Sequence, residues 1–252
     1  MIFHILTIFP EIFSSFVETG LLKKAIEKNK IEIYQHDIRD YSDDKHKNID
    51  DYSFGGGAGM IMKPEPIFKG VEAIKTNFFD TSSADVPVIL LTPQGKKLDQ
   101  KLVEKLSANK SLILICGRYG GVDDRVSKHL VTEEISLGDF ILSGGEVAAM
   151  AIIESVARLV EGVVGSKESI EKDSFTSGLL QHPQYTRPSK FRDWEVPKEL
   201  LSGNHKEILK WQRRESIIKT FHLRPDLIND ISLTQEDQKI IDSIKSKKYK
   251  QE

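Results

Sequence analysis

The sequence predicts an α/β protein with a parallel sheet, followed by a small, mainly helical C-terminal region. An apolar run at 2–9, helical spacing of apolar residues over 11–28 and a second apolar run at 31–36 form a strand–helix–strand opening, which favours parallel strands. Three later apolar runs each lead into a loop that contains glycine; they lie at 88–91, 112–116 and 135–142. Loops at the carboxyl ends of parallel strands form ligand sites, so the three runs predict one pocket with backbone walls.

The remaining elements follow from periodicity and from helix-end signals. Apolar spacing predicts helices at 64–75, 97–106, 122–130, 145–160, 206–220 and 234–246. Ser143 is the expected N-cap of the helix at 145–160, with Glu146 at the capping-box position. Residues 162–177 are small and polar without periodicity. The chain is therefore expected to divide into a domain at 1–161, a linker at 162–177 and a helical domain at 178–252.

Composition points to an ordinary globular protein. The 252 residues are 39% hydrophobic and 29% charged, and one cysteine, Cys116, excludes an intrachain disulfide, which fits a reducing cytoplasm. The apolar N-terminus lacks the basic region of a signal peptide and is expected to be a strand. No run approaches the ~20 apolar residues that a spanning helix needs, so no membrane contact is expected. The histidines show no metal-ligand spacing, so no metal centre is expected either.

Charge is distributed unevenly along the chain. Residues 1–160 hold 19 basic and 23 acidic side chains, whereas residues 187–224 hold 10 basic and 5 acidic ones. The second segment is a candidate surface for nucleic-acid phosphates. A solvated helical face would give the same composition, so charge alone leaves both interpretations open.

The glycine-rich stretch at 55–59 matches no phosphate-binding motif. No Gly-Lys-Ser/Thr follows it, as a P-loop requires. The spacing of a dinucleotide fingerprint also fails, and the preceding segment is not an apolar strand. Nucleotide hydrolysis is therefore disfavoured. The apolar residues that follow at 60–62 indicate that the loop is tethered to a packed element.

An ordered set of strings along the chain resembles one known family. The strings are DDYSFGGGAGMIMKPEP, LTPQGKKLDQ, LILICGRYGGVDDRV, SLGDFILSGGE, DSF, PQYTRP and VPKELLSGNHKEI. Together they resemble the bacterial tRNA (guanine-N1)-methyltransferases, which are knotted SPOUT-class enzymes. The resemblance implies a deep trefoil knot, S-adenosyl-L-methionine as cofactor, tRNA as partner and a homodimer with active sites at the subunit interface. The implied reaction is methylation of N1 of the guanine at position 37, beside the anticodon.

The resemblance also implies the site residues. Cofactor contacts are expected from the three glycine loops, at Leu91, Thr92, Pro93, Gly117, Tyr119, Leu137, Gly138, Asp139, Phe140, Ile141, Leu142, Gly144 and Gly145. The catalytic residues are expected to be Asp173, as general base for the N1 proton, and Arg158, which would stabilise charge on guanine O6. Without the resemblance, Asp173 would be interpreted as a solvated loop acid, and Arg158 as a partner of the helix dipole.

Contacts to tRNA are expected from an N-terminal polar loop and from the basic C-terminal region. The candidates are Arg39, His46, Asp50, Gly59, Arg187, His205, Lys210, Arg213 and Arg214. Two positions depart from the family pattern, which usually has acids where this chain has Gly120 and Gln181. The first acid is linked to magnesium, so a magnesium requirement stays open. A related knotted methyltransferase acting on another RNA and a non-catalytic RNA-binding protein are the alternatives.

Overall fold

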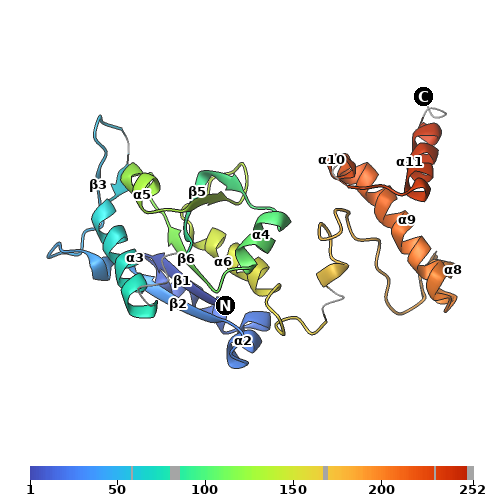
Figure 1. The fold of residues 1–252 in the computed structure, drawn as a ribbon, viewed down its shortest axis with the longest axis horizontal. Coiled ribbons are helices and arrows are strands. Elements are labelled where there is room, and N and C mark those ends of the chain that lie inside the picture. The colour runs from blue at the N-terminus through green and yellow to red at the C-terminus, as the bar shows by residue number, and fades with distance from the viewer. Residues whose placement is uncertain (58, 80–85, 167–169, 230, 249–252) are drawn as a thin grey trace. The chain divides into compact units, whose positions relative to one another are not determined.

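The computed structural model describes the whole chain except residues 58, 80–85, 167–169, 230 and 249–252 (Figure 1). The chain forms two compact units, Met1–Ser166 and Lys167–Glu252. The boundary between them falls inside the segment that composition marks as a linker.

Unit 1 is built on a five-stranded parallel sheet, which confirms the predicted class. Its strands lie in the order β2-β1-β6-β5-β7. Their bounds are β1 Ile2–Thr7, β2 Glu32–Asp37, β5 Val88–Lys97, β6 Ser111–Cys116 and β7 Glu133–Ser136. β3 (Asp50–Tyr52) and β4 (Met60–Met62) form a separate antiparallel pair. Because β5 and β6 are neighbours within the sheet, the loops after them meet at one edge of it.

Helices cover both faces of this sheet, as Figure 1 shows. The helical elements of unit 1 are η1 Pro10–Phe13, α1 Ser14–Val17, α2 Gly20–Glu27, η2 Ile38–Tyr41, α3 Pro64–Phe78, α4 Gln100–Ser107, α5 Asp124–His129 and α6 Glu146–Ala157. In β6, Leu114 and Cys116 face the core that α2, α4 and α6 cover, whereas Ile113 and Ile115 face the core that α3 covers. All six β6 residues are therefore buried, as expected of a parallel strand with both faces covered. Burial also raises the pKa of the Cys116 thiol.

Two predicted elements are shorter than the sequence indicates. The helix expected over 11–28 is broken before Gly20, whose φ of 62° is left-handed and interrupts the helix. The strand expected to reach residue 142 ends at Ser136. Phe140, Ile141 and Leu142 are exposed loop residues, so their apolar character does not come from strand burial.

A histidine of β1, His4, has no solvent exposure and packs against side chains of β2. His4 Nδ1 is 3.1 Å from His36 Nε2, and its ring meets Phe78 edge-on. Its Nε2 atom is buried without a hydrogen-bond partner in the described residues. Burial, with a smaller repulsion from His36, lowers the pKa of His4 to about 4. The folded protein therefore keeps His4 neutral at pH values where an unfolded histidine is charged.

We expect acid to destabilise the fold through His4. Between pH ~6.5 and ~4 the unfolded chain binds a proton that the folded chain does not. The free energy of unfolding therefore decreases as the pH is lowered through this range, by at most roughly 3 kcal/mol. His4→Phe keeps an aromatic ring and removes this proton. Chemical unfolding across that pH range should therefore show a shallower acid slope for His4→Phe. His129→Gln, which changes an exposed histidine, is the control. If His4→Phe showed the same acid slope as His129→Gln, His4 would not be the source of the acid sensitivity.

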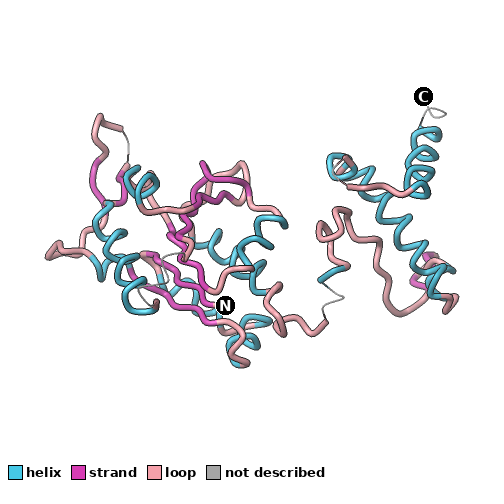
Figure 2. The backbone as a smooth tube through the Cα atoms, in the orientation of Figure 1, coloured by secondary structure: helices cyan, strands magenta, loops and turns pink. Residues whose placement is uncertain are grey.

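Unit 2 is mainly helical, with one short hairpin (Figure 2). Its elements are β8 Lys190–Phe191, β9 Trp194–Glu195, α8 Lys198–Leu201, α9 His205–Leu223, α10 Pro225–Ile228 and α11 Gln235–Lys248. Leu179, Ile217 and Ile241 form its small core. Arg213 on α9 makes a two-point ion pair with the buried Asp237 on α11, which lowers the pKa of Asp237. None of the described helices in either unit is long and apolar enough to cross a membrane.

Candidate active site

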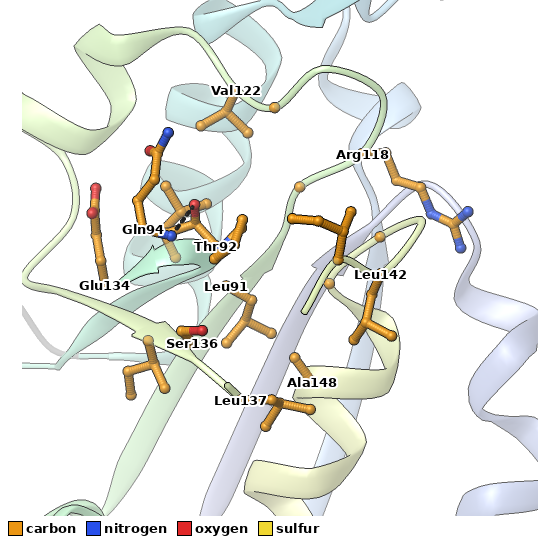
Figure 3. Close-up of a pocket in the computed structure, with 18 of the residues that line it drawn as sticks. Leu91, Thr92, Gln94, Arg118, Val122, Glu134, Ser136, Leu137, Leu142 and Ala148 are labelled. Carbon is orange, nitrogen blue, oxygen red and sulfur yellow. Dashed lines mark hydrogen bonds between the residues drawn. The ribbon is translucent and has the colours of Figure 1, made fainter. Parts of the chain in front are cut away.

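The three glycine loops come together as predicted. They enclose a cavity of about 570 Å³ at the carboxyl ends of β5, β6 and β7. Figure 3 shows Thr92 and Gln94 on one side, Val122 above them and Leu142 on the other side, with Leu91, Ala148 and Leu137 below. The lining includes polar and apolar side chains and several glycines, such as Gly117, Gly144 and Gly145. Because glycine has no side chain, its main-chain groups are open to a ligand.

The first wall comes from an outward loop within β5. Ile135 of β7 pairs with both Leu91 and Lys96, so residues 92–95 leave the strand and return to it. The Gln94 N–H donates to Thr92 Oγ1 over 3.4 Å and closes this loop. At Gly95 an added Cβ would lie 2.4 Å from Ile135 N. Only glycine fits there, which explains why the TPQG string ends as it does.

The second and third walls are joined to each other by backbone contacts. The Gly145 N–H donates to the Gly117 carbonyl over 2.9 Å, and Gly144 forms an isolated bridge with Arg118. A Cβ on Gly145 would lie 2.8 Å from Cys116 Cα and 3.1 Å from Leu91 Cβ. The loop that precedes α6 is thus pressed against the ends of β5 and β6.

The expected capping box at Ser143 is wrong. Gly145 is the N-cap of α6, without a side-chain cap bond. Glu146 instead accepts hydrogen bonds from Thr7 Oγ1 at 2.8 Å and from Arg118 Nε at 3.0 Å. This carboxylate is almost fully buried. It joins the end of β1, the loop after β6 and the start of α6, so its partners come from distant parts of the chain.

Most of the predicted cofactor residues line the cavity. They are Leu91, Thr92, Pro93, Gly117, Tyr119, Leu137, Phe140, Ile141, Leu142, Gly144 and Gly145. Gly138 and Asp139 are not among its lining residues. Gly138 holds a turn with the Ser136 hydroxyl, and Asp139 is exposed and paired with Lys97. These two residues shape the β7 loop from outside the cavity.

Several lining residues were not predicted from the sequence. Gln94, Arg118, Val122, Asp124, Ser127, Glu134, Ser136 and Ala148 also form the wall. Asp124 pairs with Lys128, whereas Glu134 forms no ion pair within the described residues. Their proximity to the glycine loops in sequence is the signal that could have identified them. Across the described ranges, no group of three or more His, Cys, Asp or Glu side chains is arranged to hold a metal ion.

Gly120, where the family pattern has an acid, is tightly packed. Its N–H donates to the Met60 carbonyl over 2.9 Å. An added Cβ would lie 3.0 Å from both Met60 O and Ile61 Cδ1. In this chain the loop after β6 therefore packs closely against β4, and a side chain at position 120 would require Met60 or Ile61 to give by a small amount.

The two predicted catalytic residues belong to different units. Arg158 is the C-cap of α6 in unit 1. Asp173 lies in a turn of unit 2, where its N–H donates to the Ile170 carbonyl over 3.2 Å. The next residue, Ser174, accepts from the Gln181 N–H over 3.0 Å. The segment that carries Asp173 is therefore hydrogen-bonded within unit 2.

The predicted tRNA contacts also divide between the two units. In unit 1, Arg39 donates to the Ile8 carbonyl, Asp50 begins β3, and His46 and Gly59 lie in exposed loops. In unit 2, Arg187, His205, Lys210 and Arg214 are candidates at or near the surface. Within the described part of the chain, Lys210 and Arg214 pair with nearby glutamates of their own helix. Arg213 differs from them because its guanidinium is committed to Asp237.

We expect Gly95→Ala to disrupt both the fold and the cavity. The new methyl group would meet the backbone of Glu134 and Ile135 at 2.4–2.7 Å, so β5 and β7 must separate, at a cost of about 2–4 kcal/mol. Chemical unfolding and cofactor titration would measure the two effects. Gly165→Ala is the matched control, because an added Cβ there has nothing within 4 Å. Equal stability of the two variants would contradict the tight β5–β7 contact.

Fold and cavity together define a class of protein. It is the class of α/β proteins with a parallel sheet in which loops at the carboxyl ends of central strands form a cavity suited to a ligand.

Comparison with known proteins narrows this class to one family. The family model described as tRNA (Guanine-1)-methyltransferase TrmD matches residues 1–230, and the chain belongs to this family. A tRNA (guanine-N(1)-)-methyltransferase of Dehalococcoides mccartyi is 49% identical over 240 residues, covering 95% of each chain. One of Alkaliphilus oremlandii is 49% identical over 98% of this chain and 100% of its own. The crystal structure of the tRNA (m1G37) methyltransferase from Aquifex aeolicus aligns with a TM-score of 0.72 and 43% identity, over 91% of this chain and 95% of that one.

Proposed function

We propose that this chain transfers a methyl group from S-adenosyl-L-methionine to N1 of the guanine at position 37 of tRNA. The observation that carries the proposal is that the family match spans residues 1–230 while three of its motif loops form the walls of one cavity. The names of the curated relatives state the tRNA and the guanine N1 atom, and the Aquifex aeolicus enzyme is described as an m1G37 methyltransferase. The reaction is compatible with a cytoplasmic location.

The cavity fits the cofactor in size and in chemistry. Its volume of about 570 Å³ is within the usual ~300–1,000 Å³ for small-molecule sites. An adenine can be recognised by the main-chain groups of the Leu91–Pro93, Gly117 and Leu137–Leu142 loops. The Glu134 carboxylate in the wall adds negative charge, which suits a cationic ligand. When bound, the cofactor would supply an activated methyl group on a sulfonium.

The chain's own contribution is proton transfer, charge stabilisation and positioning. Guanine N1 carries a proton at neutral pH. Asp173 would accept this proton, leaving an electron pair on N1 for the incoming methyl group. Arg158 would stabilise the negative charge that develops on O6. As in induced fit, binding of the correct tRNA would complete the site.

We assign one role to each part of the chain, with the bounds that the sequence predicts. Residues 1–161 would form the cofactor-binding catalytic domain, 162–177 the linker and 178–252 the tRNA-binding domain. The basic surface residues of unit 2, including Lys210 and Arg214, would contact phosphates. The target base would be turned out of its stack to reach the cavity.

A trefoil knot and a homodimer complete the proposal. The contacts of Gly144 and Gly145 with the end of β6 support the knot, because they bring the chain after β7 back against earlier loops. Phe140, Ile141, Leu142 and Val147 are exposed beside the cavity, which supports a partner subunit that covers them. Sedimentation equilibrium of the full chain should give a dimer, and a monomer would contradict this part of the proposal.

The test is transfer of a labelled methyl group to tRNA transcripts with guanine, inosine or adenine at position 37. We expect transfer only to the guanine transcript. No transfer despite measurable cofactor binding would favour a related knotted methyltransferase with another RNA substrate, or a non-catalytic RNA-binding protein. Running each arm with and without magnesium would show whether a chain with Gly120 needs the ion.

A further inference from the structure

The hairpin β8–β9 of unit 2 presents two aromatic rings to solvent. Phe191 is 57% exposed and Trp194 is 66% exposed. They are direct partners across the hairpin, and their ring centroids are 6.2 Å apart with the planes tilted by 37°. Exposed large rings that meet in one place are unusual on a soluble surface and indicate a binding site.

An arginine accompanies the two rings. Arg192 Cζ lies 5.4 Å from the Phe191 ring centroid and 5.8 Å from the Trp194 ring centroid. The residue adopts a left-handed φ of 55° in the hairpin turn, a conformation that non-glycine residues rarely adopt. Arg192 makes no ion pair with any described residue. Its positive charge is therefore available to a ligand that stacks on the rings.

The hairpin is held together without these rings. Lys190 Nζ and Glu195 Oε1 form an ion pair across it at 3.4 Å, and the Val196 N–H donates to the Ser189 carbonyl over 2.9 Å. The core of unit 2 is elsewhere, at Leu179, Ile217 and Ile241. The other tryptophan, Trp211, is only 8% exposed. The rings of the hairpin are therefore not part of the hydrophobic core of unit 2.

We infer that Phe191, Arg192 and Trp194 form a stacking platform for an unpaired base of the bound tRNA. Aromatic rings and guanidinium planes are the groups on which proteins stack unpaired bases, and the free arginine charge attracts the adjoining phosphate. The surrounding segment 187–224 carries an excess of basic residues, which favours RNA over a protein partner. The inference rests on the proposed function and adds a second recognition site to that of the methylated base.

Binding of an unmodified tRNA transcript to full-length variants tests the platform. Trp194→Leu and Phe191→Leu are each expected to weaken tRNA binding about tenfold, with cofactor affinity unchanged and kcat at saturating tRNA within about twofold. The salt dependence should stay the same for Trp194→Leu and become shallower for Arg192→Gln. In the wild type, tRNA should protect Trp194 from acrylamide quenching. Leu223→Ala, another exposed apolar residue of unit 2, is the matched control and should bind tRNA normally.

The outcomes separate this inference from the proposed function. Normal methyl transfer with unchanged tRNA affinity in the two ring variants would overturn the platform alone. Loss of dimerisation in these variants, with unchanged tRNA affinity per subunit, would assign the hairpin to a second copy of the chain and also overturn it. Failure of the wild type to bind or methylate any tRNA would overturn the proposed function, and the assignment of the hairpin with it.

Discussion

Asp173→Asn is expected to reduce methyl transfer by at least about a hundredfold while cofactor binding stays near the wild-type level. The asparagine side chain has nearly the same shape but cannot accept the N1 proton, and a positioned general base contributes roughly 10²–10⁴-fold to rate. The cavity in unit 1 is built without Asp173, so cofactor affinity should not depend on it. The loss should therefore appear in kcat rather than in the affinity for the cofactor.

Single-turnover methyl transfer and cofactor titration measure the two quantities. Glu171→Gln is the matched control, because it removes a carboxylate two residues away in the same segment and should retain full activity. Turnover of Asp173→Asn within a few-fold of the wild type would exclude Asp173 as the base. A thermal unfolding scan should match the wild type, which would separate the loss of a proton acceptor from a folding defect.

The local structure around Asp173 explains how a loop acid can be held in place. Phe175 adopts a left-handed φ of 76°, its N–H donates to the Leu179 carbonyl over 2.8 Å, and the Arg224 guanidinium lies over its ring at 5.8 Å. Leu179 is buried in the core of unit 2. The sequence suggested an unstructured linker here because these contacts join residues that have no common periodicity.

The parallel sheet could be predicted because its pattern is local. In a strand buried on both faces, such as 112–116, every residue is apolar, and a glycine marks its end. The break before Gly20 was missed because the apolar spacing continues through it, and spacing does not report the sign of φ. Likewise, the exposed Phe140–Leu142 run imitates a strand because its apolar residues serve the cavity wall.

The sequence predicted the parts of the candidate site that lie in motifs along the chain. It missed the parts whose position depends on how the strands pair. The glycine loops at 92–95, 117–121 and 137–145 were visible as strand ends. Gln94 lies inside the first of these loops but was not among the predicted site residues. Glu134 was missed because its place in the wall depends on the pairing of β7 with β5. Arg213 was grouped with the basic surface because composition cannot distinguish a solvated arginine from one that is paired with a buried carboxylate.

Glu146 is the clearest case of a residue whose role depends on tertiary contacts. Its spacing from Ser143 matches a capping box, but its carboxylate is bound by Thr7 and Arg118. Thr7 also accepts from the Phe9 N–H over 3.1 Å, and the Arg118 guanidinium lies 4.7 Å from the centroid of the Phe9 ring. One buried carboxylate thus fixes the loop after β6 and the start of α6, which together form two walls of the cavity.

We therefore expect Glu146→Ala to lower the free energy of unfolding by about 3–5 kcal/mol, because it leaves the mostly buried Arg118 without its counter-charge. Glu146→Gln keeps an acceptor for one partner and should cost less, about 1–3 kcal/mol. Cofactor affinity should fall in both variants, since Gly117 and Gly145 lose their shared anchor. Chemical unfolding with cofactor titration would measure both effects.

Glu154→Ala provides the control for this prediction, because Glu154 is exposed on the same helix and should change stability by no more than about 0.5 kcal/mol. If Glu146→Ala were as stable as Glu154→Ala, the buried ion pair would not hold the loops together. If stability fell but cofactor affinity did not, Glu146 would support the fold alone. The expected joint loss follows because the same carboxylate that stabilises unit 1 also holds the cavity walls together.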